Sequence, residues 1–199
     1  LDLTLGRKPL PIPPNQVHLA WEDLLGKFTV RTLAMVGHGW RMDESRAFHC
    51  PDKPHAVLAF DHYVLYASYV LRVRLQKTED KQALHFSLPV GDRLAGFDLD
   101  GLPADGHWTG LTLVNGKTIK EVPGNLHGEQ IRDTQVHELE FKVQLDGTKA
   151  TVNTTLDGRP IHTWDGPFAE LGQEPEWQVP SQNPAVGTMT SGWVLHQAK

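Results

Sequence analysis

The chain has 199 residues, of which 39% are hydrophobic and 22% are charged, a composition that excludes a largely disordered protein. Its formal net charge of -5 argues against a nucleic-acid partner, because proteins that bind nucleic acids carry a surplus of basic residues. The single cysteine, Cys50, excludes an intramolecular disulfide and a cysteine-based zinc site.

The N-terminal 16 residues differ in composition from the rest of the chain. They contain four prolines and little apolar periodicity, which predicts an extended arm or linker, or a recognition segment for a partner. Residues 17–199 show no further boundary or internal repeat. We expect them to form one domain, since a single β-sandwich often reaches about 200 residues.

No run of the sequence approaches the ~18 apolar residues that span a membrane. The most apolar stretch, Ala56–Val73, is interrupted by Asp61, His62 and Arg72. The chain begins at Leu1 and not at a methionine, so we expect a trimmed chain from which a signal or anchor could be missing. The lone cysteine fits either redox compartment. We expect an extracytoplasmic or secreted location.

Alternation of apolar and polar residues dominates from residue 17 onward and predicts β-strands. Short strands are expected early in the chain at Phe28–Leu33, Trp40–Met42, Ala47–His49 and Ala56–Phe60, after a single helical turn at Ala20–Leu24. Further strands are expected at Tyr69–Leu75, Leu84–Leu88, Leu94–Leu99 and Leu111–Val114. Steady turn signals separate these strands, as in an antiparallel protein.

The clearest pattern is a three-stranded meander over His137–Trp164. Apolar residues at every second position predict one buried face, and Asp146-Gly147 and Asp157-Gly158 are two-residue turns of the type that joins antiparallel strands. A helical turn at Pro167–Leu171 and a last strand or pair within Ala185–Gln197 complete the chain. Ten to twelve short strands predict an all-β protein, a two-sheet antiparallel β-sandwich.

The order of these segments resembles a concanavalin A-like lectin/glucanase domain of the LamG-like type found in planctomycete bacteria. The segments that carry the resemblance cover most of residues 20–199 and are Tyr69–Val73, Leu84–Gly91, Gly110-Leu111, Asn115–Lys117, Leu156–Pro160, Trp164–Gly166, Ala185–Gly187 and Gly192–Gln197. The resemblance implies a jelly roll of two curved sheets that binds or cleaves sugars on its concave face or rim loops. A related branch, the 3-keto-disaccharide hydrolase domain, carries an Asn-Ser-Gly-Ile-type strand. The absence of that strand from Leu84–Leu88 argues against hydrolase activity.

Tryptophans carry the main binding signal, because sugars stack on aromatic rings. Trp108 and Trp177 lie in polar loops and are expected to be exposed platforms, or else plugs that cap the edges of the sandwich. Trp40, Trp164 and Trp193 are expected in the core, and Trp21 is expected to pack the entry segment onto the sandwich. Polar ligand-binding candidates near these platforms or in the rim loops are Asp92, Arg93, Asp98, His107, Asn115 and Arg132.

We assign no catalytic residue, but Glu138 and Glu140 are candidates for a carboxylate pair. Their i, i+2 spacing separates the side chains by about 7 Å, loosely compatible with the carboxyl pair of a glycosidase. The laminarinase-type strand reads Glu-x-Asp-x-x-Glu, whereas here Glu140 is the middle acid and Val143 replaces the last one. The alternative is a solvated polar face whose charge Lys142 and Lys149 offset.

Asp98 and Asp100 form a second alternating acidic pair. Together with Asn115 or a loop carbonyl they could ligate calcium, although Asp100-Gly101 is also a good turn by itself. The eleven histidines are scattered and show no metal-binding spacing, so exposed or hydrogen-bonded histidines are expected. Calcium is therefore the only cofactor that we consider.

The leading hypothesis is a non-catalytic lectin-like module that binds carbohydrate through its rim loops or concave sheet. One alternative is a glycoside-cleaving enzyme that uses a carboxylate pair, one of whose acids would need a raised pKa. The other alternative is a structural or protein-interaction domain of a larger protein. The expected partner is a glycan or a protein.

Overall fold

A computed structural model describes residues 21–29, 38–79, 83–177, 179, 182–190 and 192–199. The predicted arm at residues 1–16, its boundary with the following domain and most of the predicted strand Phe28–Leu33 lie outside these residues.

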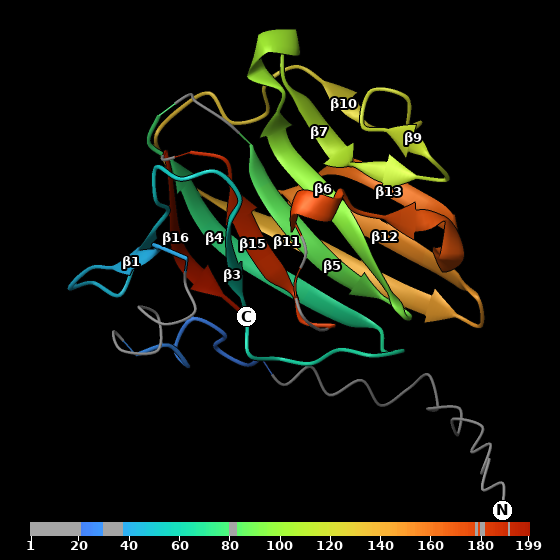
Figure 1. The fold of residues 1–199 in the computed structure, drawn as a ribbon, viewed down its shortest axis with the longest axis horizontal. Coiled ribbons are helices and arrows are strands. Elements are labelled where there is room, and N and C mark those ends of the chain that lie inside the picture. Colours follow the sequence, from blue (N-terminus) through green and yellow to red (C-terminus); the bar gives the residue numbers. More distant parts are fainter. Residues whose placement is uncertain (1–20, 30–37, 80–82, 178, 180–181, 191) are drawn as a thin grey trace, which may run out of the picture.

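Two antiparallel sheets pack face to face and form a β-sandwich, which confirms the predicted fold class (Figure 1). The seven-stranded sheet has the order β1 (Arg41–Met42), β2 (Phe48–His49), β16 (Trp193–Ala198), β4 (Tyr69–Lys77), β11 (Val136–Asp146), β12 (Lys149–Leu156) and β13 (Arg159–Pro167). The six-stranded sheet has the order β10 (Leu126–His127), β7 (Trp108–Leu111), β6 (Arg93–Gly101), β5 (Leu84–Val90), β15 (Ala185–Thr188) and β3 (Ala56–Ala59).

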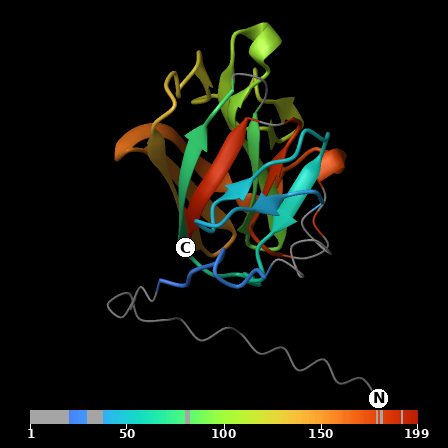
Figure 2. The ribbon, with the colours of Figure 1, turned by 90° about the vertical axis from the view of Figure 1, so that its left-hand side faces the viewer.

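Small elements decorate this sandwich. A three-stranded sheet joins β14 (Leu171–Gly172), β8 (Leu113–Val114) and β9 (Lys117–Thr118), and three 3-10 turns are η1 (Pro103–Asp105), η2 (Phe168–Glu170) and η3 (Pro175–Trp177). The strand β16 lies beside β4, so the C-terminal strand is an inner strand of its sheet (Figure 2). Within the described part of the chain, no helix has the length and apolar character needed to cross a membrane.

Alternation in the sequence places the core correctly. Leu139, Phe141 and Val143 on β11 are fully buried between the sheets. The ring of Phe141 lies 5.0 Å from the ring of Phe86 on β5 and 5.0 Å from that of Phe97 on β6. Aromatic contacts of this kind bury large apolar surface and favour specific geometries, so Phe141 fixes one sheet against the other.

Most of the remaining expectations are also met. The meander pairs as predicted, and the helical turn expected at Pro167–Leu171 is present as η2. Trp40, Trp164 and Trp193 are buried, as expected. Trp21 remains 40% exposed and contacts the charged groups of Arg72 and Lys199.

Two expectations about secondary structure are wrong. The described residues of the expected helical turn at Ala20–Leu24 contain no helical turn, and the described chain has sixteen strands where ten to twelve were predicted. The additional strands, such as β9 and β10, are only two residues long. A two-residue strand is too short to show any alternation, and only tertiary pairing defines it.

One histidine lies between the sheets. His162 on β13 is 4% exposed, its ring lies 5.7 Å from that of Phe97, and its Nε2 has no hydrogen-bond partner. Burial lowers the pKa of His162 to about 4, because the charged imidazole would lose its hydration without gaining a counter-ion.

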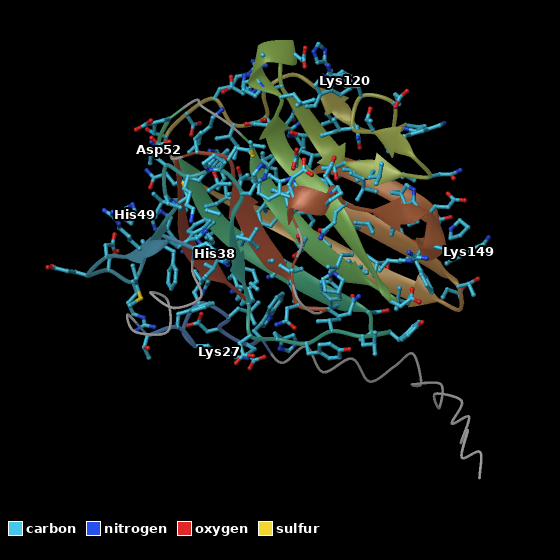
Figure 3. All side chains as sticks on the ribbon, viewed as in Figure 1. Lys27, His38, His49, Asp52, Lys120 and Lys149 are labelled. Atoms are coloured by element: carbon cyan, nitrogen blue, oxygen red, sulfur yellow. The ribbon has the colours of Figure 1, made fainter. Side chains whose placement is uncertain are left out.

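His162 should make the protein less stable in acid. Between about pH 6.5 and pH 4 the unfolded chain binds a proton at this residue that the folded chain does not. The free energy of unfolding should therefore fall by roughly 3 kcal/mol across that window. Urea unfolding at several pH values should show this loss in the wild-type protein and in His38→Gln, a variant of an exposed histidine (Figure 3). His162→Leu should not show this loss of stability. The same dependence of the free energy of unfolding on pH in all three proteins would contradict the prediction.

Candidate functional site

The outer face of the six-stranded sheet carries a polar floor. Because Phe86 on β5 points into the core, its neighbours His85 and Ser87 point to the opposite face. Both side chains are nevertheless about 1% exposed. His85 is paired in register with Asp98 of β6, and its Nδ1 lies 2.7 Å from Oδ1 of that carboxylate.

Trp177 of η3 covers this floor, and η3 lies in front of β5 and β6 (Figure 1). Its ring stacks on His85, with centroids 4.3 Å apart and an interplanar angle of 5°, and meets the ring of His55 edge-on at 5.0 Å. A Cβ at Gly187 of β15 would lie 2.7 Å from the indole, so only glycine allows the ring to lie this close to the strand. Trp177 is thus 6% exposed, which contradicts the expected exposed platform and agrees with the alternative expectation of a structural plug.

A second polar pair lies beside the first. The hydroxyl of Thr112 donates to Glu174, with 2.7 Å between Oγ1 and Oε2. A Cβ at Gly96 of β6 would lie 2.3 Å from this Thr112 oxygen and 3.0 Å from Cε1 of His85. The two pairs therefore converge over one glycine, and their carboxylates come from different elements, Asp98 from β6 and Glu174 from the turn before η3.

Buried polar atoms without partners gather at this place. Among the described residues eight buried side-chain nitrogen or oxygen atoms have no hydrogen-bond partner. Four of them surround Trp177 and the floor beneath it: His55 Nδ1, His85 Nε2, Ser87 Oγ and Gln173 Oε1. A buried polar atom without a partner costs about 1–3 kcal/mol. Such a concentration indicates a place where water or the polar groups of a ligand complete the hydrogen bonds.

Of the residues predicted to bind a ligand, only Asp98 and Trp177 lie at this face. Asp92 lies in the β5–β6 turn and Arg93 begins β6, whereas His107 and Trp108 lie at the other end of β6. The nine residues of β6 span roughly 30 Å. The two groups therefore cannot share a small site.

The upper end of the sandwich in Figure 3, marked by Lys120, holds the second group. Trp108 is half-buried and its ring lies 4.7 Å from that of His127. Lys120 pairs with Asp105 at 2.8 Å in the same region. The expected exposed platform at Trp108 is therefore only partly open.

Arg132 and Asn115 lie in two further pockets. Arg132 lines a pocket of about 380 Å³ with Arg159 and His137. The pKa of His137 is raised, because hydrogen bonds to Asp157 and Asp133 outweigh the opposing effect of burial. Asn115, at the β8–β9 turn, lines a pocket of about 360 Å³ that also includes Trp164, Asp165 and Glu170. Neither pocket includes a residue of the polar floor.

Glu138 and Glu140 lie on the outer face of the opposite sheet. Both carboxylates face Arg72 of β4, which forms an ion pair with Glu140 and lies 4.0 Å from Glu138. The expectation that Lys142 and Lys149 offset their charge is thus wrong, because the neighbouring strand β4 supplies the counter-ion. The candidate carboxylate pair is far from the polar floor, on the other side of the sandwich.

Asp98 and Asp100 do not form the expected pair. The pairing of β6 with β7 is interrupted by a register shift between Asp98 and Gly101, and Asp100 has a φ of 54°. Asp98 consequently faces His85, whereas Asp100 is turned into the protein and is 1% exposed. The two carboxylates therefore bind different partners in this structure. Among the described residues no group of three or more His, Cys, Asp and Glu side chains is placed to hold a metal ion.

Asp100 instead fastens the loop before β11 to the end of the sheet. Its oxygens accept the N–H groups of Gln130 and Ile131 at 2.6 and 3.1 Å, and Nζ of the buried Lys77 lies 3.6 Å away. Lys77 also contacts Glu129 at 2.6 Å. Burial raises the pKa of Asp100, against the opposing effect of these N–H groups and of Lys77.

Removal of this carboxylate should be strongly destabilising. Asp100→Ala would leave two buried N–H groups and part of the Lys77 charge without a partner, and breaking a buried pair costs about 3–5 kcal/mol. Urea unfolding should show a loss of this size, against no more than ~0.5 kcal/mol for the exposed Asp52→Ala (Figure 3). Equal free energies of unfolding for the two variants would show that the contacts of Asp100 do not stabilise the protein.

Sequence reasoning missed His55, His85, Ser87, Thr112 and Glu174. The polar positions of an alternating strand normally face solvent, so His85 and Ser87 gave no sign of burial. One signal was available in the sequence. Gly96 and Gly187, on strands that pair with β5, leave space above the outer face for another segment.

The sandwich and its covered polar face define a protein with the concanavalin A-like jelly-roll fold. No known protein family and no curated protein match the sequence. Among solved structures, the exoplasmic/lumenal domain of VIP36 is similar with a TM-score of 0.52 at 8% identity, over 80% of this chain and 81% of that chain. Winged bean acidic lectin reaches 0.48 at 13% identity over 81% and 90%, and a β-1,3-glucanase of Mycobacterium marinum reaches 0.46 at 10% identity over 80% and 76%. The likeness to VIP36 establishes the fold.

Proposed function

We propose that the protein binds carbohydrate at the outer face of the six-stranded sheet, beside Trp177. The observation that carries this proposal is the group of four buried polar atoms without partners at one place. A sugar hydroxyl both donates and accepts hydrogen bonds, so it can be the missing hydrogen-bond partner of an imidazole nitrogen, a serine hydroxyl or an amide oxygen.

The surrounding groups suit the same ligand class. Asp98 and Glu174 accept hydrogen bonds from hydroxyl groups, and their other oxygens are already oriented by His85 and Thr112. The Trp177–His85 stack lies directly beside these groups. The VIP36 domain, which shares the fold, was solved in a form with Ca²⁺ and Man3GlcNAc bound. The predicted extracytoplasmic location fits a glycan ligand.

Ser87→Ala provides a sharp test, because Ser87 Oγ has no partner within the described chain. Stability should be unchanged or higher, since the variant removes an unsatisfied buried hydroxyl. If a sugar hydroxyl pairs with Ser87, binding on a glycan array and by calorimetry should weaken roughly 3- to 10-fold.

Thr154→Val is the matched control for Ser87→Ala. Thr154 Oγ1 is another buried hydroxyl without a partner, but it lies between the sheets, next to His162 in the β12–β13 pairing. This variant should bind glycans like the wild-type protein. Absence of glycan binding by the wild-type protein would contradict the proposal and favour a protein partner, and equal binding by Ser87→Ala would place the site elsewhere.

A second candidate function is glycoside cleavage at the same face. The observation that favours it is the state of His85, whose Nδ1 is held by Asp98 while its Nε2 has no partner. An imidazole that is oriented through one nitrogen and unpaired at the other has the arrangement of a general base.

Incubation with the glycans that bind would test this candidate. An enzyme should release reducing sugar, and His85→Gln should lower the rate by about 10²- to 10⁴-fold, the usual contribution of general acid–base catalysis. His62→Gln, a variant of an exposed histidine, is the control. Stable binding without any product would leave the lectin-like function as the activity of this face.

A further inference from the structure

Exposed aromatic side chains gather on the loop between β3 and β4. Among the described residues six large hydrophobic side chains are exposed, and three of these lie within four positions: Tyr63 at 62%, Leu65 at 43% and Tyr66 at 55%. This loop runs along the lower end of the sandwich in Figure 1 and Figure 2. Single exposed apolar residues are ordinary, whereas a contiguous group marks an interaction site.

The loop is joined to the chain that follows η3. The backbone N–H of Val64 donates to the carbonyl of Gln182 at 2.8 Å, and that of Phe60 donates to the carbonyl of Pro184 at 2.9 Å. The Gln182 side chain donates to the carbonyl of Asp92 at 3.1 Å, and its Oε1 is another buried atom without a partner. Trp177 packs with Val57 of β3 and Ala185 of β15, so these hydrogen bonds link the strands beneath Trp177 to the β5–β6 turn.

The groups at this end combine aromatic rings with charged hydrogen-bonding groups. Asp92 and Arg93 each expose 54% of the side chain and lie 3.9 Å apart. Partial desolvation and the nearby Asp92 carboxylate raise the pKa of Tyr66, so the phenol stays neutral at physiological pH. Tyr63 makes no ring contact or side-chain hydrogen bond with the described residues.

We propose that Tyr63, Tyr66, Asp92 and Arg93 form a second subsite, so that the protein binds an extended glycan chain and not a single terminal sugar. This inference rests on the proposed function, since it lengthens the same surface. Tyrosine rings offer a face for the C–H side of a sugar and a hydroxyl for its edge, and the flanking carboxylate and guanidinium bind further hydroxyls.

The chemistry of the loop favours a glycan over a membrane as the occupant. A membrane-binding loop usually adds basic residues that attract anionic lipids. Here the only cation of the subsite, Arg93, is offset by Asp92, and the whole chain has a net charge of -5.

The inference predicts a dependence on the length of the ligand. Laminarin and mannan, each compared with its disaccharide, are the probes for calorimetry with the full chain. Tyr63→Ala and Tyr66→Ala should weaken polysaccharide binding about tenfold and leave disaccharide binding unchanged, because a disaccharide fills the first subsite alone. Leu102→Ala, which changes an exposed residue at the opposite end of β6, should bind both probes like the wild-type protein.

The outcomes separate this inference from the proposed function. Polysaccharide binding that Ser87→Ala weakens and the tyrosine variants do not would overturn the second subsite only. Equal weakening of disaccharide and polysaccharide by the tyrosine variants would also overturn it. Absence of binding to either polysaccharide, with an empty glycan array, would overturn the proposed function and this inference together. If the wild-type protein binds anionic vesicles and Tyr63→Ala abolishes this binding, the ligand of the loop is a membrane and not a glycan.

Discussion

The arrangement of the two sheets depends on the packing of Phe141 against Phe86 and Phe97. These three rings lie on β11, β5 and β6 and join the two sheets across the core. Since side chains alternate along a strand, an inward Phe86 turns His85 and Ser87 outward. A shift of one residue in the strand register would turn His85 and Ser87 inward and Phe86 outward. Burial of the phenylalanines therefore also determines which side chains form the polar floor.

The 3-10 turn η3 covers this polar floor. Trp177 lies over His85 and Gly187. The missing side chain at Gly187 makes room for the indole, and the one at Gly96 makes room for Thr112, Gln173 and His85. Both faces of β5 are consequently covered, and every residue of this strand is buried. Antiparallel sheets commonly leave one face to solvent, so the covering is the feature that distinguishes this sandwich.

Buried polar groups are handled in two ways. The carboxylate of Asp100 accepts the N–H groups of Gln130 and Ile131 and lies beside the Lys77 ammonium. These contacts hold the loop before β11 against the sheet. Around Trp177 the polar atoms stay without partners, although burying them is costly. The glycan that we propose as ligand would supply hydrogen-bond partners to the second group.

Local pattern by itself determined the sandwich. The alternation in His137–Trp164 and the Asp-Gly turns predicted the meander, because both signals act between neighbours in the chain. The site depended on contacts between distant segments: Trp177 reads as a loop residue in its polar surroundings, yet it is buried against His85, and Asp98 and Asp100 read as a pair, yet a bulge separates them. Tertiary structure alone decided these points, since alternation tells which way a side chain points within its strand but not what lies above it.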